Sequence, residues 1–262
     1  MEESNKKYTY FASDFHLGAP TDAISLVREK EIVAWLNYIE PTAKEVFLVG
    51  DIFDFWFEYK HAIPKGFTRF LGKIADLTDK GIKVHFFCGN HDMWMFDYLE
   101  KEVGIELHRD DYQVQIGTKK FFIAHGDGLG PGDKGYKFIK KIFRNKFCQW
   151  AFARLHPNFG IALASYFSKT SRISNGEEDA LYVGPEKEWL HHFVSDNHHQ
   201  LKADYYIFGH RHLPLKFQIQ NALYFNLGEW INYQTFGRFD DTNFELLAWK
   251  DKTISPYKTI SE

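Results

Sequence analysis

Short apolar runs alternate with longer amphipathic stretches along the first half of the chain. The runs at 8–13, 46–49 and 84–88 are rich in aromatic and β-branched residues, which is typical of buried strands. The segments 26–39 and 67–77 place apolar residues at helical spacing. This alternation predicts βαβ units and a largely buried sheet, which is an α/β fold. The remaining expected elements are hairpins at 112–124 and 215–226, a helix at 186–199 and strands at 205–208 and 244–249.

Composition narrows the class of protein. With 262 residues and 44% hydrophobic residues, the chain can bury a sizeable core, and an aromatic content of 18% excludes disordered and fibrous classes. No apolar run approaches the roughly 18 residues of a membrane span, and the first residues lack an apolar stretch long enough for a secretion signal. The only cysteines are Cys88 and Cys148, which favours a reducing compartment such as the cytoplasm.

Residues able to bind a metal follow several of the expected strands. Ligands of open α/β sheets bind beyond the carboxyl ends of the strands, so we expect these residues to meet at one place. Each block alone is weak evidence, whereas the ordered set is specific. The blocks are Asp14-Phe15-His16, Gly50-Asp51-Ile52-Phe53-Asp54, Gly89-Asn90-His91-Asp92, His125-Gly126-Asp127 and Gly209-His210-Arg211-His212.

The residue types in these blocks suit a pair of divalent metal ions. Carboxylate, imidazole and amide oxygen are ligands for Mn²⁺, Fe²⁺ or Zn²⁺. Asp14 and His16 alternate along an extended chain and should therefore point to one face, as should His210 and His212. Two ions roughly 3.5–4 Å apart need a bridging carboxylate and can clamp the attacking and leaving oxygens of a phosphoryl transfer. Asp51 is the expected bridge.

In this order the blocks resemble the calcineurin-like metallophosphoesterase family. The resemblance implies a four-layer αββα sandwich of two mixed sheets with helices outside. It also implies a binuclear metal centre and a phosphoric-ester or anhydride hydrolase. The first metal would take Asp14, His16, Asp51 and His212. The second would take Asp51, Asn90, His125 and His210.

Within this resemblance, His91 is the expected catalytic group that faces the phosphate. An imidazolium can neutralise charge in the transition state and protonate a leaving oxygen. Asp92 is expected to orient the His91 ring, as carboxylates commonly do. The alternative is that His91 only fixes its loop.

The segment 134–172 has a charge unlike that of the rest of the chain. It holds nine basic residues and no acidic residue, a charge of +9, so the remainder carries −12. Apolar residues between Phe138 and Trp150 recur at helical spacing and predict one amphipathic basic helix. A second helical piece is expected at 161–167, after a turn at His156-Pro157-Asn158. We therefore expect a helical cap inserted at 134–175 in a core formed by 1–133 and 176–262.

A basic helix with many aromatic residues suits an anionic membrane surface or a phosphorylated amphiphile. The alternative is a cap whose aromatic residues pack on their own protein. A single-stranded nucleic-acid groove is disfavoured, because the apolar content is too continuous for a stacking platform. The residues expected to touch membrane or lipid are Lys137, Lys140, Lys141, Phe143 and Trp150.

From Tyr8 to Trp230 the chain resembles the UDP-2,3-diacylglucosamine diphosphatases of lipid A synthesis. The likeness includes the run from Gly50 to Trp56, which fits that family's G-D-x-F-x-x-W, and the run His125-Gly126-Asp127-Gly128-Leu129. It also includes the cap and its end, Lys169-Thr170-Ser171-Arg172. The best-known members have arginine where His91 stands, and histidine cannot give the same bidentate phosphate grip.

This second resemblance implies a reaction and a location. UDP-2,3-diacylglucosamine would be cleaved at its pyrophosphate to UMP and 2,3-diacylglucosamine 1-phosphate, with Mn²⁺ as the metal. The protein would sit peripherally on the cytoplasmic face of an inner membrane, with no nucleic-acid partner. The residues implied as substrate contacts are Trp56, Asn90, His91, Asp133, Ser171 and Asn175.

Two other functions stay open at this point. One is a metallophosphodiesterase acting on another nucleotide, nucleic acid or phospholipid, because the core does not name a substrate. The other is a non-catalytic scaffold on the same fold. Scaffolds of this kind lose metal ligands, whereas all seven expected ligands are present here.

Overall fold

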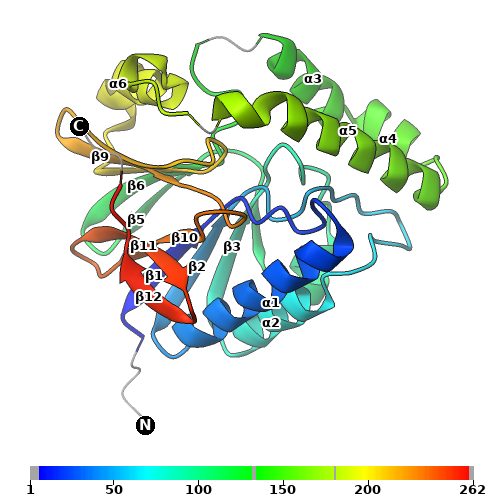
Figure 1. Cartoon of the computed structure of the whole chain (residues 1–262), viewed down its shortest axis with the longest axis horizontal. Helices are drawn as coiled ribbons and strands as arrows, with labels where there is room; N and C mark the ends of the chain where they lie inside the picture. Colours follow the sequence, from blue (N-terminus) through cyan, green and yellow to red (C-terminus); the bar gives the residue numbers. More distant parts are fainter. Residues whose placement is uncertain (1–5, 132–133, 180, 260–262) are drawn as a thin grey trace.

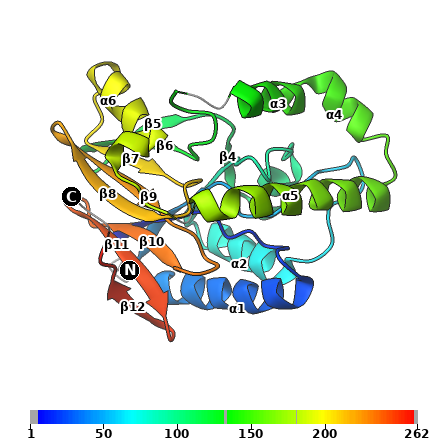
Figure 2. The ribbon, with the colours of Figure 1, turned by 45° about the horizontal axis from the view of Figure 1, so that its top comes forward.

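The computed structural model describes residues 6–131, 134–179 and 181–259, with only the backbone described for 134–135, 169 and 171–179. Two sheets pack face to face, and helices cover both outer faces (Figures 1 and 2). The larger sheet has the order β12 (Thr253–Pro256), β11 (Phe244–Lys250), β10 (Thr235–Phe239), β1 (Tyr8–Ala12), β2 (Ala43–Val49), β3 (Lys83–Phe87) and β4 (Glu106–His108). The smaller has the order β5 (Tyr112–Ile116), β6 (Lys119–Ala124), β7 (Tyr205–Phe208), β9 (Ala222–Leu227) and β8 (Pro214–Ile219).

Both sheets are mixed, as expected for the αββα class. Strands β1 to β4 run parallel, and β10 to β12 extend the larger sheet in antiparallel fashion. In the smaller sheet β6, β7 and β9 are parallel, with β5 and β8 antiparallel at the edges. The helices of the core are α1 (Asp22–Ile39), α2 (Thr68–Asp79) and α6 (Trp189–Leu201), with a short π-helix η1 (Leu99–Val103) and a short 3₁₀-helix η2 (Pro185–Lys187).

The central strands of the larger sheet are buried on both faces, which explains their continuous apolar runs. In β1, Tyr10 and Ala12 face α1 and α2, whereas Phe11 points between the two sheets. In β2, Leu48 likewise faces the helices, whereas Val49 points between the two sheets. Strands buried on both faces need apolar residues at every position, so they read as unbroken hydrophobic runs.

Three strands were not expected from the sequence. They are β4, β10 and β12, and each is short or interrupted by charged and small residues. In β10 the residue Gly237 leaves room for a ring, because a Cβ there would lie 2.2 Å from Phe244 Cζ. The aromatic ring of the neighbouring strand fills this space, so the pairing depends on tertiary packing that periodicity does not encode.

The expected single helix between Phe138 and Trp150 is wrong, because the chain breaks there. It forms α3 (Lys134–Arg144) and α4 (Lys146–Phe152), and α5 (Pro157–Asp179) follows. Asn145 Oδ1 accepts hydrogen bonds from the backbone N–H groups of Phe147 and Cys148 at 2.8 and 3.3 Å. An asparagine in this position caps a new helix and outweighs the continuous apolar spacing.

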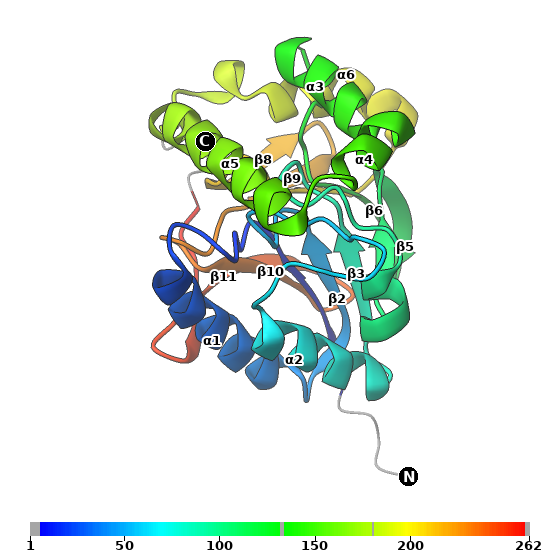
Figure 3. The ribbon, with the colours of Figure 1, turned by 90° about the vertical axis from the view of Figure 1, so that its right-hand side faces the viewer.

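Helices α3, α4 and α5 lie over the carboxyl ends of β2 and β3 (Figure 3). Helix α5 runs to Asp179, four residues beyond the expected end of the cap at 175. The division into core and cap stays a prediction. Among the described helices, none has both the length and the apolar character that crossing a bilayer requires.

Candidate metal centre

The expected ligands converge at the carboxyl ends of strands from both sheets. Ligand atoms of Asp14, His16, Asp51 and His212 all lie within 4.8 Å of one another. Asp51 is shared with a second group that contains His125 and His210. Within the first group His16 Nε2 is 3.1 Å from His212 Nε2, and in the second Asp51 Oδ2 is 3.3 Å from His125 Nε2.

Asn90 completes the set that the sequence indicated. Its Oδ1 lies 3.2 Å from His125 Nε2, on the side of the second group. Two overlapping groups that share one carboxylate have the donor types and the closeness that a pair of divalent ions needs. The residues present therefore fit a binuclear centre.

The backbone around the ligands differs from the expected extended chain. The φ angles of Asp14, His16, Asp51, His210 and His212 are 55°, 44°, 52°, 65° and 59°. This left-handed region is costly for residues other than glycine, and such strain gathers at functional sites. The side chains of Asp14 and His16 thus meet through tight turns, and the expectation of period-two alternation was wrong.

Two glycines allow the ligand blocks to approach one another. A Cβ on Gly89 would lie 2.1 Å from Asp51 Oδ1, and one on Gly50 would lie 2.5 Å from His125 Nδ1. No side chain fits at either position without moving a ligand. The glycines in these blocks therefore act as spacers for the site.

Backbone carbonyl groups orient the ligand loops. His125 Nδ1 lies 2.9 Å from the carbonyl oxygen of Val49 and donates to it, which leaves Nε2 free to face the centre. The buried Arg28 donates to the carbonyl of His16 at 2.7 Å. Asn226 Nδ2 donates to the carbonyl of Gly209 at 2.5 Å. These contacts fix the turns that carry the ligands.

The site attracts positive charge. Burial alone would raise the pKa of Asp51, but the neighbouring His125 and His91 outweigh it and hold that pKa well below its usual range. Burial lowers the pKa of His125, yet the Asp51 carboxylate raises it to about 10. A buried group of carboxylates that holds its negative charge stabilises cations at this place.

Asp92 has a different role from the expected one. Its carboxylate accepts hydrogen bonds from the backbone N–H groups of Gly89, Ile52 and Phe53 at 2.8, 2.8 and 3.2 Å. Burial, with the charge of Asp51, raises the pKa of Asp92 to about 7. The expectation that it orients His91 was wrong, because its oxygens join the loops after β2 and β3.

The ring of His91 is instead held by Asp54 and by the cap. His91 Nδ1 lies 3.1 Å from the carbonyl oxygen of Asp54 and 2.9 Å from Ser168 Oγ. Its Nε2 is 4.0 Å from Asp51 Oδ2. Ser168 is on α5, so the cap reaches the expected catalytic histidine directly.

Sequence reasoning did not assign roles to Asp54 and Ser168. The carboxylate of Asp54 lies 3.6 Å from His16 Nδ1 and 4.0 Å from His91 Nδ1, so it sits behind two site histidines. Its signal was its place at the end of the block that begins with Gly50-Asp51. Ser168 carried no such signal, because it lies in a cap helix far from the blocks in sequence.

The expected substrate contacts have different outcomes. Trp56 is fully buried, stacks on Phe53 at a centroid distance of 4.3 Å and donates to Glu58 Oε1 at 3.2 Å. It belongs to the core, so its expected position at the head group was wrong. Asp133 and the side chains of Ser171 and Asn175 lie outside the described residues.

Two of the expected membrane lysines hold the cap to the core. Lys140 Nζ is 2.5 Å from Asp127 Oδ2, and Lys137 Nζ donates to the carbonyl of Gly130 at 2.6 Å. Tyr136 also donates to Asp127 Oδ2, at 2.5 Å. A buried carboxylate requires a partner cation, so Lys140 anchors the cap to the core, and its contact with lipid stays a prediction.

The outer surface of the cap is rich in exposed apolar residues. Trp150 is 53% exposed, and Phe143 is 37% exposed with its ring edge-to-face on Trp94 at 5.1 Å. Lys141 is exposed as well. Among the described residues of the cap, the other large apolar side chains that are exposed are Phe138, Ile139, Ile142, Phe147, Phe159, Tyr166 and Phe167.

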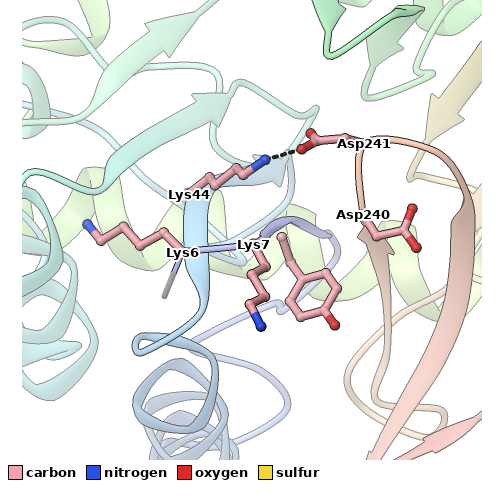
Figure 4. A pocket seen from close by; sticks show the side chains of 6 residues that line it. Lys6, Lys7, Lys44, Asp240 and Asp241 are labelled. Carbon is pink, nitrogen blue, oxygen red and sulfur yellow. Dashed lines mark hydrogen bonds and ion pairs between the residues drawn. The ribbon is translucent and has the colours of Figure 1, made fainter. Parts of the chain in front are cut away.

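Two charged features do not belong to the candidate metal centre. Arg211, between two ligands in sequence, is buried and forms a salt bridge with Glu188 at 3.0 Å. A pocket of about 310 Å³ near the start of β1 and β2 is lined by lysines and aspartates, with Lys44 paired to Asp241 (Figure 4). It lies at the amino ends of these strands, whereas the ligands follow their carboxyl ends.

Comparison with known proteins identifies the family. Residues 9–214 match the model of the calcineurin-like phosphoesterases. The chain belongs to this family. The αββα layers and the convergence of the ligand blocks agree with a metallophosphoesterase, which is a hydrolytic enzyme.

Relatives and solved structures resemble the chain to different degrees. The UDP-2,3-diacylglucosamine hydrolase of Porphyromonas gingivalis is 38% identical and covers 92% of this chain and 97% of its own length. The enzyme of the same name from Edwardsiella ictaluri is 25% identical over 91% of each chain. Among solved structures, the phosphoesterase Yfce from E. coli is 16% identical, with a TM-score of 0.44 and coverage of 94% of this chain and 96% of its own.

Proposed function

We propose that this protein hydrolyses the pyrophosphate bond of UDP-2,3-diacylglucosamine, releasing UMP and 2,3-diacylglucosamine 1-phosphate. The observation that supports this most is the 38% identity to a UDP-2,3-diacylglucosamine hydrolase over nearly the whole of both chains. The grouping of the ligand side chains around Asp51 agrees with the required chemistry. The reaction belongs to lipid A synthesis.

Two divalent ions, with Mn²⁺ as the proposed metal, would be held by the two groups that share Asp51. Asp14, His16 and His212 would hold the first ion, and Asn90, His125 and His210 the second. Bound ions of this kind polarise phosphoryl oxygens and lower the pKa of water. The donor set of carboxylate, imidazole and amide oxygen is compatible with Mn²⁺.

His91 would contact the phosphate beside this centre. Its Nδ1 faces the Asp54 carbonyl and Ser168 Oγ, so Nε2 is the nitrogen left to meet the substrate. A proton on Nε2 can neutralise negative charge as the phosphorus–oxygen bond breaks. The contacts to Asp54 and Ser168 hold the ring in one orientation, which lowers the cost of reaching that geometry.

The surface of the cap is the reason to propose an acylated substrate and a peripheral location at the cytoplasmic face of the inner membrane. Its exposed aromatic residues, such as Phe147 at 71% exposure, offer apolar area of the kind that enters a lipid interface. The charge of +9 in 134–172 favours anionic phosphates and lipid head groups.

A substrate panel with purified protein and Mn²⁺ tests the proposal. UDP-2,3-diacylglucosamine, UDP-glucose and a bis-aryl phosphate are compared, with UMP or aryl alcohol as the readout. We expect UMP release from the diacylated substrate to exceed that from UDP-glucose by orders of magnitude. Turnover of the bis-aryl phosphate without UMP release from the lipid would instead assign another phosphodiester as the substrate.

Asp51→Asn tests the metal assignment, because it removes the charge of the carboxylate that both ions would share. Loss of the shared carboxylate should lower kcat by roughly 10²–10³-fold or more, the range seen when charge stabilisation at a reacting centre is lost. Asp79→Asn, an exposed aspartate at the end of α2, is the matched control. Near wild-type kcat for Asp51→Asn would contradict the metal assignment, and unmeasurable activity of every variant and of the wild type would contradict the enzyme.

A further inference from the structure

A second cluster of metal-binding side chains lies away from the centre described above. We infer that His85, Glu106 and His108 form a separate site for a divalent transition metal ion, with zinc as the best fit. This cluster is on β3 and β4 of the larger sheet, and none of its members belongs to the five metal-binding blocks. The proposed catalytic function uses none of these residues.

The distances between the ligand atoms match a tetrahedral ion. His85 Nδ1 lies 3.0 Å from His108 Nε2. Glu106 Oε2 is 3.6 Å from His85 Nδ1, and Glu106 Oε1 is 3.7 Å from His108 Nε2. With metal–ligand bonds of about 2.0–2.1 Å, the ligands of tetrahedral zinc are roughly 3.3–3.4 Å apart. The two imidazole nitrogens and the Glu106 carboxylate therefore lie close to the spacing of one face of a zinc site.

Strand register produces this arrangement. His85 and Glu106 are Cα partners on the parallel strands β3 and β4, and His108 pairs with Phe87. Glu106 and His108 are two residues apart on β4, so their side chains lie on the same face of the sheet. The site thus depends on regular strand geometry that is fixed by the pairing of the sheet.

Aromatic rings fix both imidazoles. The His85 ring stacks on Phe47 with a centroid distance of 4.2 Å and an interplanar angle of 10°. The His108 ring lies 4.6 Å from Phe87 and 4.3 Å from Tyr112. Because these rings already lack rotational freedom, metal binding would cost little conformational entropy.

The other nitrogen of His85 lies near a carboxylate that could orient the ring. His85 is buried, and its Nε2 has no hydrogen-bond partner among the described residues. This nitrogen lies 3.6 Å from Glu45 Oε2. When Nδ1 of a histidine binds a metal, the proton resides on Nε2 and usually points to a carboxylate. Glu45 is placed to receive it, as the positioning residue of the site.

The two metal sites would act separately. His85 lies within β3, whereas Asn90 follows the carboxyl end of that strand, and the two groups share no residue. Glu106 and His108 belong to β4, which has three residues and forms the edge of the sheet. An ion at this place would fasten that short strand to β3. We therefore assign the site a stabilising role, without a part in the hydrolysis.

Zinc binding to the whole protein tests this inference. Protein loaded with Mn²⁺ and freed of excess metal is equilibrated with graded Zn²⁺, and metal per chain is measured by mass spectrometry after rapid desalting. We expect the wild type to retain one more zinc ion per chain than Glu106→Gln or His108→Gln, with the affinity of this site lowered at least about 10-fold in both variants. Glu102→Gln, an exposed glutamate on η1, should bind like the wild type.

Histidine signals give a second readout, and the measurement on the wild type does not depend on the folding of a variant. Zinc should shift the imidazole resonances of His85 and His108 in nuclear magnetic resonance spectra, and Glu106→Gln should remove that shift. Equal zinc retention by the wild type and Glu106→Gln would overturn the site. Imidazole resonances of His85 that do not move with zinc would overturn it as well.

Discussion

Among the described residues of the cap, Ser168 contacts the proposed catalytic histidine directly. Ser168 Oγ lies 2.9 Å from His91 Nδ1 and donates to the Asp54 carbonyl at 2.9 Å. The Ser168 hydroxyl therefore connects α5 both to the loop after β2, through Asp54, and to His91, the expected catalytic acid. Positioning of this kind affects turnover more than it affects metal binding.

Ser168→Ala should lower kcat several-fold without changing the metal content. A hydrogen bond of this type contributes about 0.5–1.5 kcal/mol, which corresponds to roughly 2- to 12-fold. Steady-state kinetics of UMP release measures the effect, and metal analysis checks the centre. Thr170→Ala is the matched control, because among the described residues its hydroxyl donates to the carbonyl of Tyr166 in the same helix and not to the site. A kcat equal to that of the wild type would show that the hydroxyl does not position His91.

The seven expected ligands could be named from the sequence because each stands in a short block beside glycine, aspartate or histidine at a strand end. The structure brings these residues together, and their ligation of metal stays a prediction. The positive φ angles of Asp14 and His210 could not be predicted, because sterics alone disfavour them. Such conformations are imposed by the packing of the whole fold around the site.

At the scale of elements, the cap combines an anchored inner side with an apolar outer side. Lys140 pairs with the buried Asp127, and Trp94 Nε1 donates to the carbonyl of Phe143 at 2.8 Å. On the outer side Phe147 and Trp150 stack at a centroid distance of 5.6 Å. Helical spacing correctly indicated helices in this segment, but it could not separate anchoring lysines from exposed ones, since that difference depends on Asp127.

Removal of exposed aromatic rings should weaken binding to anionic vesicles. A double change of Phe147→Ser and Trp150→Ser removes two side chains whose burial is worth about 1.5–3 kcal/mol each, so we expect at least a 10-fold lower partition coefficient. Sedimentation with vesicles that contain phosphatidylglycerol measures it. Val27→Ser, at an exposed apolar position of α1, should behave like the wild type. Equal sedimentation of the double variant would contradict the membrane role of the cap.

For the whole molecule, the proposed metal centre joins the two halves of the sandwich. Asp14, Asp51 and Asn90 follow strands of the larger sheet, whereas His125 and His210 follow strands of the smaller one. An ion held by residues from both sheets binds the folded state and not the unfolded chain. Such binding adds about 2.7 kcal/mol at 100 times the Kd.

Chelation of metal should therefore lower the melting temperature. For a chain of this size, the loss of about 2.7 kcal/mol corresponds to roughly 5 °C or more. Calorimetry over a series of Mn²⁺ concentrations measures the change, and Asp51→Asn should show a much smaller dependence. A melting temperature that does not vary with Mn²⁺ in the wild type would contradict a centre shared by both sheets.

Gly50 and Gly89 occupy places where even one added carbon would collide with Asp51 or His125. Neither glycine can touch an ion or a substrate through a side chain. Natural variation at these two positions should nonetheless be as restricted as at the ligands, since every replacement displaces a ligand. Tolerance to substitution should therefore be as low at these two glycines as at the ligands, because their role is to leave space that a side chain would fill.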